Sequence, residues 1–483
     1  MKRFENFIGG EWVTPSSGSY YQNYNPAQPQ QVLGDFPSST AADVDRAVEA
    51  ASEAFKTWRE VPGPQRGMLL YRFAELLDNA KEELGKIITL EQGKALTEAV
   101  GEVARAGSEA RFMAGEASRI GGRTFPSERT GYSCHTILEP IGVVAAISPW
   151  NFPVVTPIRK IAPALAFGNT VVFKPASLTP WSAVYLTQLF NRAGFPAGVV
   201  NLVVGSGRSV GNQLVNNHQV KGITFTGSTA VGIPLFEQAS KRLMKVQLEL
   251  GGKNPAVVWG YDDLDGAAKE IVTAAFLCSG QRCTALSRVI VSEREADLLA
   301  ERVVHHTKQI KVGNGLFDGT TMGPLVSRAQ LETVEDYVQK GVREGASLLC
   351  GGQRLVADPE HEGYYHEPTV FDRVGAASPL AQEEIFGPVL PILRATSFEE
   401  AIGIANSTRY GLAASLFSAS MKLVHRFMRS VEVGMIHINH GTASQPHVPF
   451  GGVKESGYGA YSIGPTVKDF YTHVKTVYTR WEL

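Results

Sequence analysis

The sequence predicts an α/β protein made of two doubly wound α/β domains, and three observations lead to this fold class. Short β-branched runs alternate with helix-length segments, which is the pattern of successive βαβ units. These runs are apolar on both faces, as in parallel strands that helices cover on both sides. The chain has 483 residues, which is enough for two or three domains of ordinary size.

Two amphipathic helices are expected near the start of the chain. From Thr40 to Trp58 apolar residues recur at helical spacing, with Thr40 a suitable N-cap and Asp43 at the third helical position. A second helix follows Pro64, where a stripe of apolar residues continues to Leu84. The N-terminal stretch is therefore expected to be mostly helical.

Strands and helices alternate after Ile141. The first strand-like runs are IGVVAAI, TVVFK, VVNLVV, KGITF, KVQLEL and NPAVVW, with a helix from Trp181 to Ala193 between them. A second α/β series, from about Gly252 to Phe450, contains expected strands at 288–292, 347–350 and 389–393. The Gly-rich stretch 449–459 is typical of a loop. Two α/β lobes of this kind place a cleft between them.

Charge and composition limit the classes of function. Lys and Arg number 46 and Asp and Glu number 47, so no overall field attracts nucleic acid or anionic lipid. No apolar run reaches the roughly 18 residues that span a bilayer. The first residues, MKRFENFIGGEW, lack the apolar core of a secretory signal. We therefore expect a cytoplasmic protein with no nucleic-acid or membrane partner.

The four cysteines are too few and too scattered for a disulfide framework or a zinc site, so we expect reduced thiols and no metal. Cys283, in CSGQRCTA, is the candidate nucleophile. Its thiolate would be strongly nucleophilic if Arg282, backbone amides or a following helix N-terminus lowered its pKa. The alternative is an inert packing thiol, although the polar loop around Cys283 favours reactivity.

Two more side chains have the right chemistry at the ends of strand-like runs. Glu249 follows KVQL and precedes Gly251 and Gly252, where the backbone can approach a ligand, so it suits a general base. Asn151, in ISPWNFP, lies in a turn between two prolines after an apolar strand, which suits an oxyanion-binding amide. The alternatives are a solvated strand-end carboxylate and an ordinary turn asparagine.

Glycine-rich turns follow two of the strands. VVGSGRSVG, which contains Gly207, nearly fits the dinucleotide fingerprint but misses its usual spacing. FTGSTAVG is the better candidate, because a strand runs into Gly227 and Ser228 at an expected helix start, where free amides favour a phosphate. Both could equally be simple strand-to-helix turns. Lys174, in VVFKPAS, is placed to bond a sugar or to lie at the surface.

Taken together and in order, these segments resemble the NAD(P)-dependent aldehyde dehydrogenase superfamily from about Asn6 to Tyr478. The motifs that carry the resemblance are PWNFP, FKPAS, FTGS, LELGGKNP, GQRCTA, EEIFGPV and PFGGVKESG. The resemblance implies that Cys283 attacks an aldehyde to give a thiohemiacetal, with its oxyanion held by Asn151 and the Cys283 backbone amide. After hydride transfer to nicotinamide, Glu249 would activate the water that hydrolyses the thioester to a carboxylic acid.

The resemblance also implies a set of cofactor-binding residues: Ile147, Trp150, Lys174, Ser177, Gly207, Gly227, Ser228, Leu250, Gly251, Glu384 and Phe386. Within this set, Lys174 resembles the lysine that bonds the adenosine ribose, and Glu384 the ligand of the nicotinamide ribose. Ser177 stands where many NAD-selective relatives carry a glutamate. A carboxylate there would repel a 2′-phosphate, so NADP is permitted, with use of both NADP and NAD as the alternative.

The substrate is expected to be a small-molecule aldehyde in contact with Phe152, Arg159 and Arg282. Arg159 resembles an arginine that contacts the distal carboxylate in succinic-semialdehyde dehydrogenases, and GQRCTA also resembles 2-oxoglutaric-semialdehyde dehydrogenases. The second arginine expected six positions before the cysteine is Leu277, and Arg282 is the candidate to replace it. Neutral aliphatic, hydroxy or aromatic aldehydes are the alternative substrates. A CoA-acylating enzyme and a non-catalytic scaffold are the alternative functions.

Domain limits follow from the same resemblance. A dinucleotide-binding domain is expected at residues 1–121 and 141–251, and a catalytic domain at 252–450. Oligomerisation strands are expected at 122–140 and 465–483, where the sequence alternates in the manner of strands. Such strands add to a neighbouring subunit, so a homodimer or homotetramer is expected.

Overall fold

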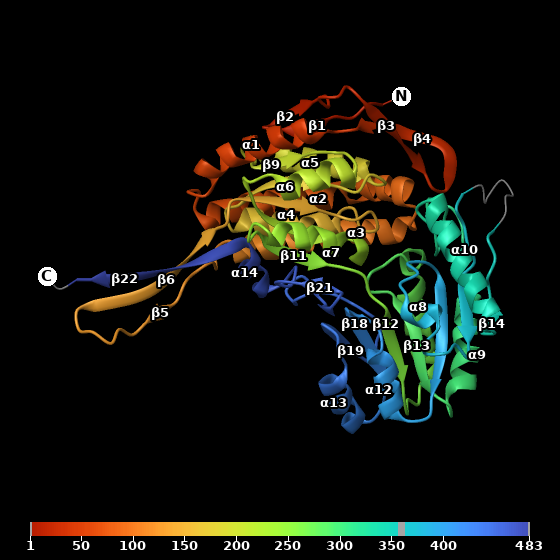
Figure 1. The fold of residues 1–483 in the computed structure, drawn as a ribbon. Coiled ribbons are helices and arrows are strands. Elements are labelled where there is room, and N and C mark those ends of the chain that lie inside the picture. The colour runs from red at the N-terminus through yellow and green to blue at the C-terminus, as the bar shows by residue number, and fades with distance from the viewer. Residues whose placement is uncertain (1, 356–362, 482–483) are drawn as a thin grey trace.

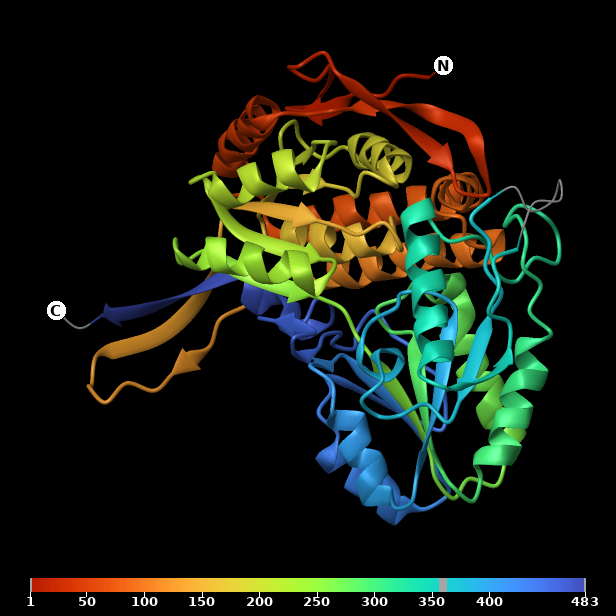
Figure 2. The ribbon, with the colours of Figure 1, turned by 45° about the vertical axis from the view of Figure 1, so that its right-hand side comes forward.

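The computed structural model describes residues 2–355 and 363–481 and contains two α/β lobes and a projecting β arm (Figure 1). The predicted fold class is confirmed, since each lobe is built on its own doubly wound sheet and the arm forms a separate small sheet. The two lobes meet along one side, and the arm leaves the N-terminal lobe in both views (Figure 2).

The N-terminal lobe is built on an eight-stranded sheet. Its strands lie in the order β2 (Glu11–Val13), β1 (Asn6–Ile8), β9 (Val200–Leu202), β8 (Thr170–Lys174), β7 (Val143–Ile147), β10 (Val220–Thr226), β11 (Lys245–Glu249) and β21 (Gly457–Tyr458). The five strands from β9 to β11 are parallel. Chain order reverses at β7, and ligands bind at the carboxyl ends of strands at such a point.

Helices cover both faces of this sheet, and the residues of β7 show why. Val144 and Ala146 join the core under one set of helices, whereas Val143, Ala145 and Ile147 join the core on the opposite face. The first set comprises α2 (Gly63–Gln92), α3 (Leu96–Glu116), α4 (Val155–Ala166) and α5 (Pro180–Ala193). The second comprises α1 (Ala41–Trp58), η1 (Gly207–Gly211), α6 (Asn212–Asn216) and α7 (Thr229–Ser240).

The predicted helices α1, α2 and α5 are confirmed, and α1 begins after Thr40, whose backbone N–H donates to the Asp43 carboxylate at 2.9 Å. The expectation of a mostly helical N-terminal stretch is wrong before Thr40. Residues 6–37 contain β1, β2 and a hairpin of β3 (Tyr20–Asn25) and β4 (Gln28–Pro37). The hairpin mixes exposed, half-buried and buried residues without a regular period, so it has no clear alternation of apolar and polar residues.

The C-terminal lobe is built on a seven-stranded sheet. Its strands lie in the order β14 (Ser347–Cys350), β15 (Thr369–Asp372), β16 (Val389–Ala395), β13 (Leu286–Ser292), β12 (Asn254–Val258), β18 (Ala413–Phe417) and β19 (Met435–Ile438). All neighbours are parallel except β14 and β15. Around it lie α8 (Leu264–Phe276), η2 (Leu277–Gly280), α9 (Ala296–Thr307), α10 (Arg328–Arg343), α11 (Pro379–Gln382), α12 (Phe398–Asn406) and α13 (Met421–Ser430).

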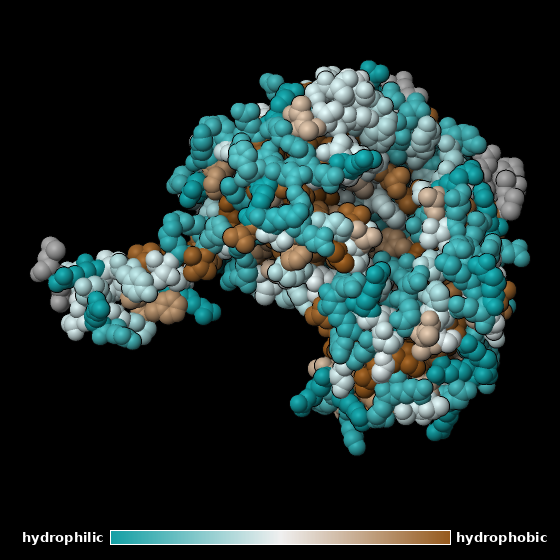
Figure 3. Space-filling view, viewed as in Figure 1, coloured by the Kyte–Doolittle hydropathy of each residue, from teal (hydrophilic) through white to brown (hydrophobic). Residues whose placement is uncertain are grey.

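The arm is a three-stranded antiparallel sheet in the order β22 (Thr472–Arg480), β6 (Tyr132–Pro140) and β5 (Thr124–Phe125). It joins the N-terminal lobe through η3 (Pro465–Val467) and α14 (Lys468–Tyr471). The large apolar and aromatic side chains exposed along it are Phe125, Ile137, Val474, Tyr478 and Trp481. Figure 3 shows a few brown, hydrophobic residues among teal and white ones on the surface of the arm. The last two residues of the predicted strand segment 465–483 lie outside the described residues, and the domain limits stay a prediction.

The segment 449–459 is only partly the loop that its glycines suggest. It contains β20 (Val453–Lys454), which pairs with β17 (Tyr410–Gly411) of the C-terminal lobe, and β21, which pairs with β11 of the other sheet. The segment therefore ties the two lobes together. Within the described residues, no helix is long and apolar enough to cross a membrane.

Candidate active site

A cavity of about 720 Å³ lies where the two lobes meet, at the carboxyl ends of β7, β10 and β11. Most of the predicted site residues line it: Trp150, Asn151, Phe152, Arg159, Gly227, Ser228, Glu249, Leu250, Gly251, Arg282, Cys283, Glu384 and Phe386. Residues far apart in the chain are thus brought to one place, because parallel strands end at the same edge of a sheet.

Four predicted cofactor residues do not line this cavity. Ile147 ends β7 and is buried in the core. Lys174 ends β8, and its Nζ donates to the carbonyl of Pro175 at 2.8 Å, while burial lowers its pKa to about 8. Ser177 Oγ donates to the carbonyl of Gly205 at 3.2 Å, two residues before Gly207. Lys174 and Ser177 therefore lie outside the cavity, after the end of β8, and their place in a cofactor site stays a prediction.

Cys283 lies in the loop between η2 and β13, half-buried in the cavity wall. Just before this loop, η2 takes a left-handed path, with φ of 55° at Cys278 and 57° at Ser279. A strand, not a helix, follows the thiol, so the expected helix N-terminus is absent. Burial, reinforced by the Glu249 charge, raises the pKa of Cys283 to about 11, although Arg159 and Arg282 oppose the rise. The expected lowering by Arg282 is therefore outweighed by desolvation.

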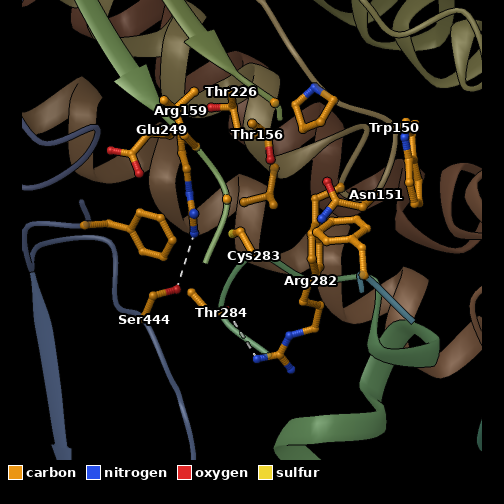
Figure 4. Close-up of a pocket in the computed structure, with 18 of the residues that line it drawn as sticks. Trp150, Asn151, Thr156, Arg159, Thr226, Glu249, Arg282, Cys283, Thr284 and Ser444 are labelled. Atoms are coloured by element: carbon orange, nitrogen blue, oxygen red, sulfur yellow. Dashed lines mark hydrogen bonds between the residues drawn. The ribbon is translucent and has the colours of Figure 1, made fainter. Parts of the chain in front are cut away.

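Asn151 lies in the turn between β7 and α4, and only 4% of it is exposed. Its Nδ2 donates to the carbonyl of Gln281 at 2.9 Å, so the amide is tied to the loop that carries Cys283. In Figure 4 the Asn151 amide and the Cys283 thiol lie side by side in the cavity. Among the described residues the second N–H of this amide has no acceptor, and it is available to an oxygen on a ligand.

Glu249 ends β11 and is buried on the other side of Cys283 (Figure 4). Burial raises its pKa to about 8, against the charges of Lys160 and Arg159. Its Oε2 has no hydrogen-bond partner among the described atoms. A carboxylate with such a pKa and an unpaired oxygen is suited to accept a proton near neutral pH.

Lys160 is a buried residue of this site that the sequence reasoning missed. It lies on α4 behind Glu249, and its Nζ donates to Thr224 Oγ1 at 3.2 Å. Burial lowers its pKa to about 7, while the Glu249 charge acts in the opposite direction. The signal was visible, because Arg159 and Lys160 are adjacent cations in the otherwise apolar segment VVTPIRKIAPALAF.

Arg159 enters the cavity but is already paired. Its Nη2 lies 2.9 Å from Oε1 of Glu109, and its Nε lies 3.0 Å from Oε2. Arg105 shares the same carboxylate at 2.9 Å. Ser444 Oγ accepts from Arg159 at 3.3 Å (Figure 4). Glu109, Arg105 and Ser444 were not predicted, and their positions in the chain give no signal of this cluster.

Arg282 differs from the other cavity arginines because no carboxylate of the described chain lies within ion-pair distance of it. Its Nη2 donates to Thr442 Oγ1 at 3.0 Å. Burial lowers the pKa of this guanidinium, while the charges of Cys278, Glu98 and Cys283 act in the opposite direction. A half-buried cation with no carboxylate within ion-pair distance favours an anionic ligand.

Glu384, Trp150 and Phe386 surround the end of the cavity nearest Gly251. Glu384 Oε1 accepts the N–H of Gly252 at 2.8 Å, and a Cβ at Gly251 would lie 2.3 Å from Oε2. A larger residue here would have to displace the Glu384 carboxylate. The rings of Trp150 and Phe386 meet edge to face, with centroids 5.4 Å apart.

Comparison with known proteins identifies the family of the chain. The profile of the Aldehyde dehydrogenase family matches residues 12–477. The chain is 43% identical to an alpha-ketoglutaric semialdehyde dehydrogenase of Bacillus subtilis (strain 168) over 98% of both chains. It is 38% identical to a succinate-semialdehyde dehydrogenase [NADP(+)] of Escherichia coli (strain K12), over 97% of this chain and 96% of the other. An NAD+ complex of an aldehyde dehydrogenase from Bacillus cereus superposes with a TM-score of 0.96 at 37% identity, covering 100% and 97% of the two chains.

Proposed function

Because the chain belongs to the aldehyde dehydrogenase family, we propose that it oxidises a small aldehyde bearing a distal carboxylate to the dicarboxylic acid, with NADP or NAD. The observation that carries the substrate class is the half-buried Arg282, whose guanidinium lines the cavity with no carboxylate within ion-pair distance among the described residues. A substrate carboxylate would offset the desolvation of that charge and accept two parallel hydrogen bonds from the guanidinium. The names of the two relatives also denote aldehydes that carry a carboxylate.

The first chemical step is attack of the Cys283 thiolate on the aldehyde carbon. A C–S bond forms and the carbonyl electrons move to oxygen, which becomes an oxyanion. The unused N–H of Asn151 and the backbone N–H of Cys283 are the donors assigned to it. Donors fixed in a buried site need little rearrangement when charge develops, and one such donor is worth about 10²- to 10³-fold in rate.

The cofactor residues fit a dinucleotide. The glycine at position 251 lets the backbone lie against Glu384, whose carboxylate would hold the nicotinamide ribose. Lys174 retains donor capacity beyond its bond to Pro175 and would hold the adenosine ribose. A bound nicotinamide supplies the hydride acceptor. Ser177 places no carboxylate at the ribose, so a 2′-phosphate is accepted and NADP is used at least as well as NAD.

Hydrolysis of the Cys283 thioester completes the reaction. Water attacks the thioester carbon, its proton passes to Glu249, and the sulfur leaves as thiolate. The raised pKa of Glu249, about 8, suits a group that takes and releases a proton at each turnover. A CoA-acylating enzyme would not need this carboxylate beside the thiol. Turnover of purified protein without added CoA or phosphate is the expected result, and strict dependence on either would reject hydrolysis.

The substrate class is tested with four- and five-carbon aldehydes that end either in a carboxylate or in a methyl group. The acids are expected to have a kcat/KM about 10- to 150-fold higher, from about 1.5–3 kcal/mol for hydrogen bonds to a charged group. Each aldehyde is assayed with both NAD and NADP. Equal kcat/KM for matched acids and neutral aldehydes would leave a neutral aliphatic, hydroxy or aromatic aldehyde as the substrate.

The arm is the proposed contact between subunits, in a homodimer or a dimer of dimers. Apolar side chains lie exposed along it, and the outer edges of β5 and β22 are unpaired in the described chain.

The proposed domain limits are 1–121 with 141–251 for the dinucleotide, and 252–450 for catalysis. A non-catalytic scaffold is the remaining alternative. Labelling of Cys283 by iodoacetamide argues against it, and an inert Cys283 would favour it.

A further inference from the structure

A buried ion pair lies directly behind the turn that carries Asn151. It joins Lys94, in the connection between α2 and α3, to Glu102 on α3, with Nζ and Oε2 2.7 Å apart. Both side chains are 1% exposed. Neither residue has a role in the chemistry proposed above. A fully buried charge pair costs desolvation free energy unless good geometry and further hydrogen bonds offset it.

Lys94 holds the backbone of the turn from one side. Its Nζ donates to the carbonyl oxygen of Asn151 at 2.7 Å and lies 3.9 Å from the centroid of the Phe152 ring. An ammonium has three N–H donors. One is used by Glu102, one by Asn151, and the third faces the ring, so the group fixes the turn on both sides of the peptide bond between Asn151 and Phe152.

Glu102 holds the same turn from the other end. Its Oε1 accepts the N–H groups of Val154 at 2.8 Å and Val155 at 3.1 Å, where α4 begins. Helix α4 has no side-chain cap of its own at Val154. The carboxylate therefore takes the place of the cap, and the single ion pair anchors residues 151–155 at both ends.

From these contacts we infer that Lys94 and Glu102 are positioning residues that aim the Asn151 amide at the oxygen of the reacting aldehyde. They contact no substrate and act only through the turn. The inference rests on the proposed role of Asn151. An oxyanion donor works only when it is aimed at the place where charge develops, and a shift of about 1 Å costs about 10²-fold in rate.

A double-mutant cycle on the first burst of NAD(P)H tests this inference. Asn151→Ala is expected to slow the burst about 10²- to 10³-fold. Lys94→Met is expected to slow it about 10- to 100-fold. If Lys94 acts through Asn151, the double variant is no more than about threefold slower than Asn151→Ala alone. A merely structural role of Lys94 makes the two losses multiply.

The outcomes separate the two claims. A wild-type burst rate in Asn151→Ala would reject the proposed role of Asn151, whatever Lys94 does. A slow Asn151→Ala beside a normal Lys94→Met, or multiplying losses, would overturn only the positioning inference. If Lys94→Met does not fold, Glu102→Gln replaces it in the cycle, because the amide keeps the shape and loses the charge.

Glu91 supplies the matched control. Its buried carboxylate accepts the N–H groups of Trp181 at 2.8 Å and Ser182 at 2.9 Å, at the start of α5. Glu91→Gln thus removes a buried carboxylate from the same kind of helix start, at α5 and not at the turn that carries Asn151. Its burst rate is expected within about threefold of wild type, whereas Glu102→Gln falls well below. Equal losses in the two variants would show a general effect of buried charge and overturn the inference.

Discussion

Replacing Arg282 by Met should remove the preference for acidic aldehydes over neutral ones. At about 4 Å and an effective dielectric constant of about 20, a guanidinium and a carboxylate attract by about 4 kcal/mol, part of which is lost to desolvation. A net difference of about 2 kcal/mol corresponds to about a 30-fold fall in kcat/KM. Methionine keeps the length of the side chain and removes the charge.

The hydrogen bonds around Arg282 limit the structural damage that Arg282→Met can cause. Thr442 Oγ1, which accepts from Arg282, also donates to the carbonyl of Thr284 at 2.7 Å and so keeps a partner in the variant. The assay is the ratio of kcat/KM for an acidic aldehyde to that for the neutral aldehyde of equal length. Damage to Cys283 or to cofactor binding cancels in this ratio. An unchanged ratio in Arg282→Met would refute the assignment of Arg282 to the carboxylate.

Four further predictions concern the catalytic and specificity residues. Cys283→Ala should abolish aldehyde oxidation, and retained dehydrogenase turnover would refute the nucleophile. Glu249→Gln should keep the burst of NAD(P)H but slow steady-state turnover. A base must be deprotonated, and the pKa of Glu249 is raised to about 8, so wild-type steady-state turnover should rise with pH from 6 to 8. The Glu249→Gln variant should lose this rise. A burst lost in Glu249→Gln would place Glu249 in an earlier step. Ser177→Glu should lower kcat/KM for NADP relative to NAD by about tenfold or more through repulsion of the 2′-phosphate, measured with one aldehyde and both cofactors. Arg159→Leu should weaken acidic aldehydes less than Arg282→Met does and should lower the Tm, because Glu109 loses one of its two arginines; equal losses for acidic and neutral aldehydes would remove Arg159 from substrate recognition.

Burial raises the pKa of both Cys283 and Glu249, and the charge of Glu249 raises the pKa of Cys283 further. Each negative charge makes the other more costly, so the thiol and the carboxyl do not both ionise easily. Lys160 and Arg159 supply positive charge that lowers the pKa of Glu249, and Arg159 also lowers that of Cys283. With its pKa raised to about 11, the thiolate of Cys283 is a minor species near neutral pH.

Much of the fold was predictable because local composition controls it. The strands β7, β8, β10 and β11 are short and apolar on both faces, and only a parallel sheet covered by helices satisfies such a sequence. The hairpin of β3 and β4 was missed because its residues carry no clear periodic signal. The proposed catalytic residues could be named from the sequence because each lies in a short motif at a strand end or in a polar loop.

The sequence by itself determined the two doubly wound domains, the family to which the chain belongs, and the identity of Cys283, Glu249 and Asn151 as candidates, since each follows from residues close together in the chain. Tertiary structure alone decided how those groups are charged and held. Arg159 pairs with Glu109, 50 positions away, and Lys94 of the ion pair with Glu102 holds Asn151, 57 positions away. Within the described residues, only the folded chain shows that no carboxylate lies within ion-pair distance of Arg282. Electrostatic energies depend on distance and burial in space, and neither quantity is written in the order of residues.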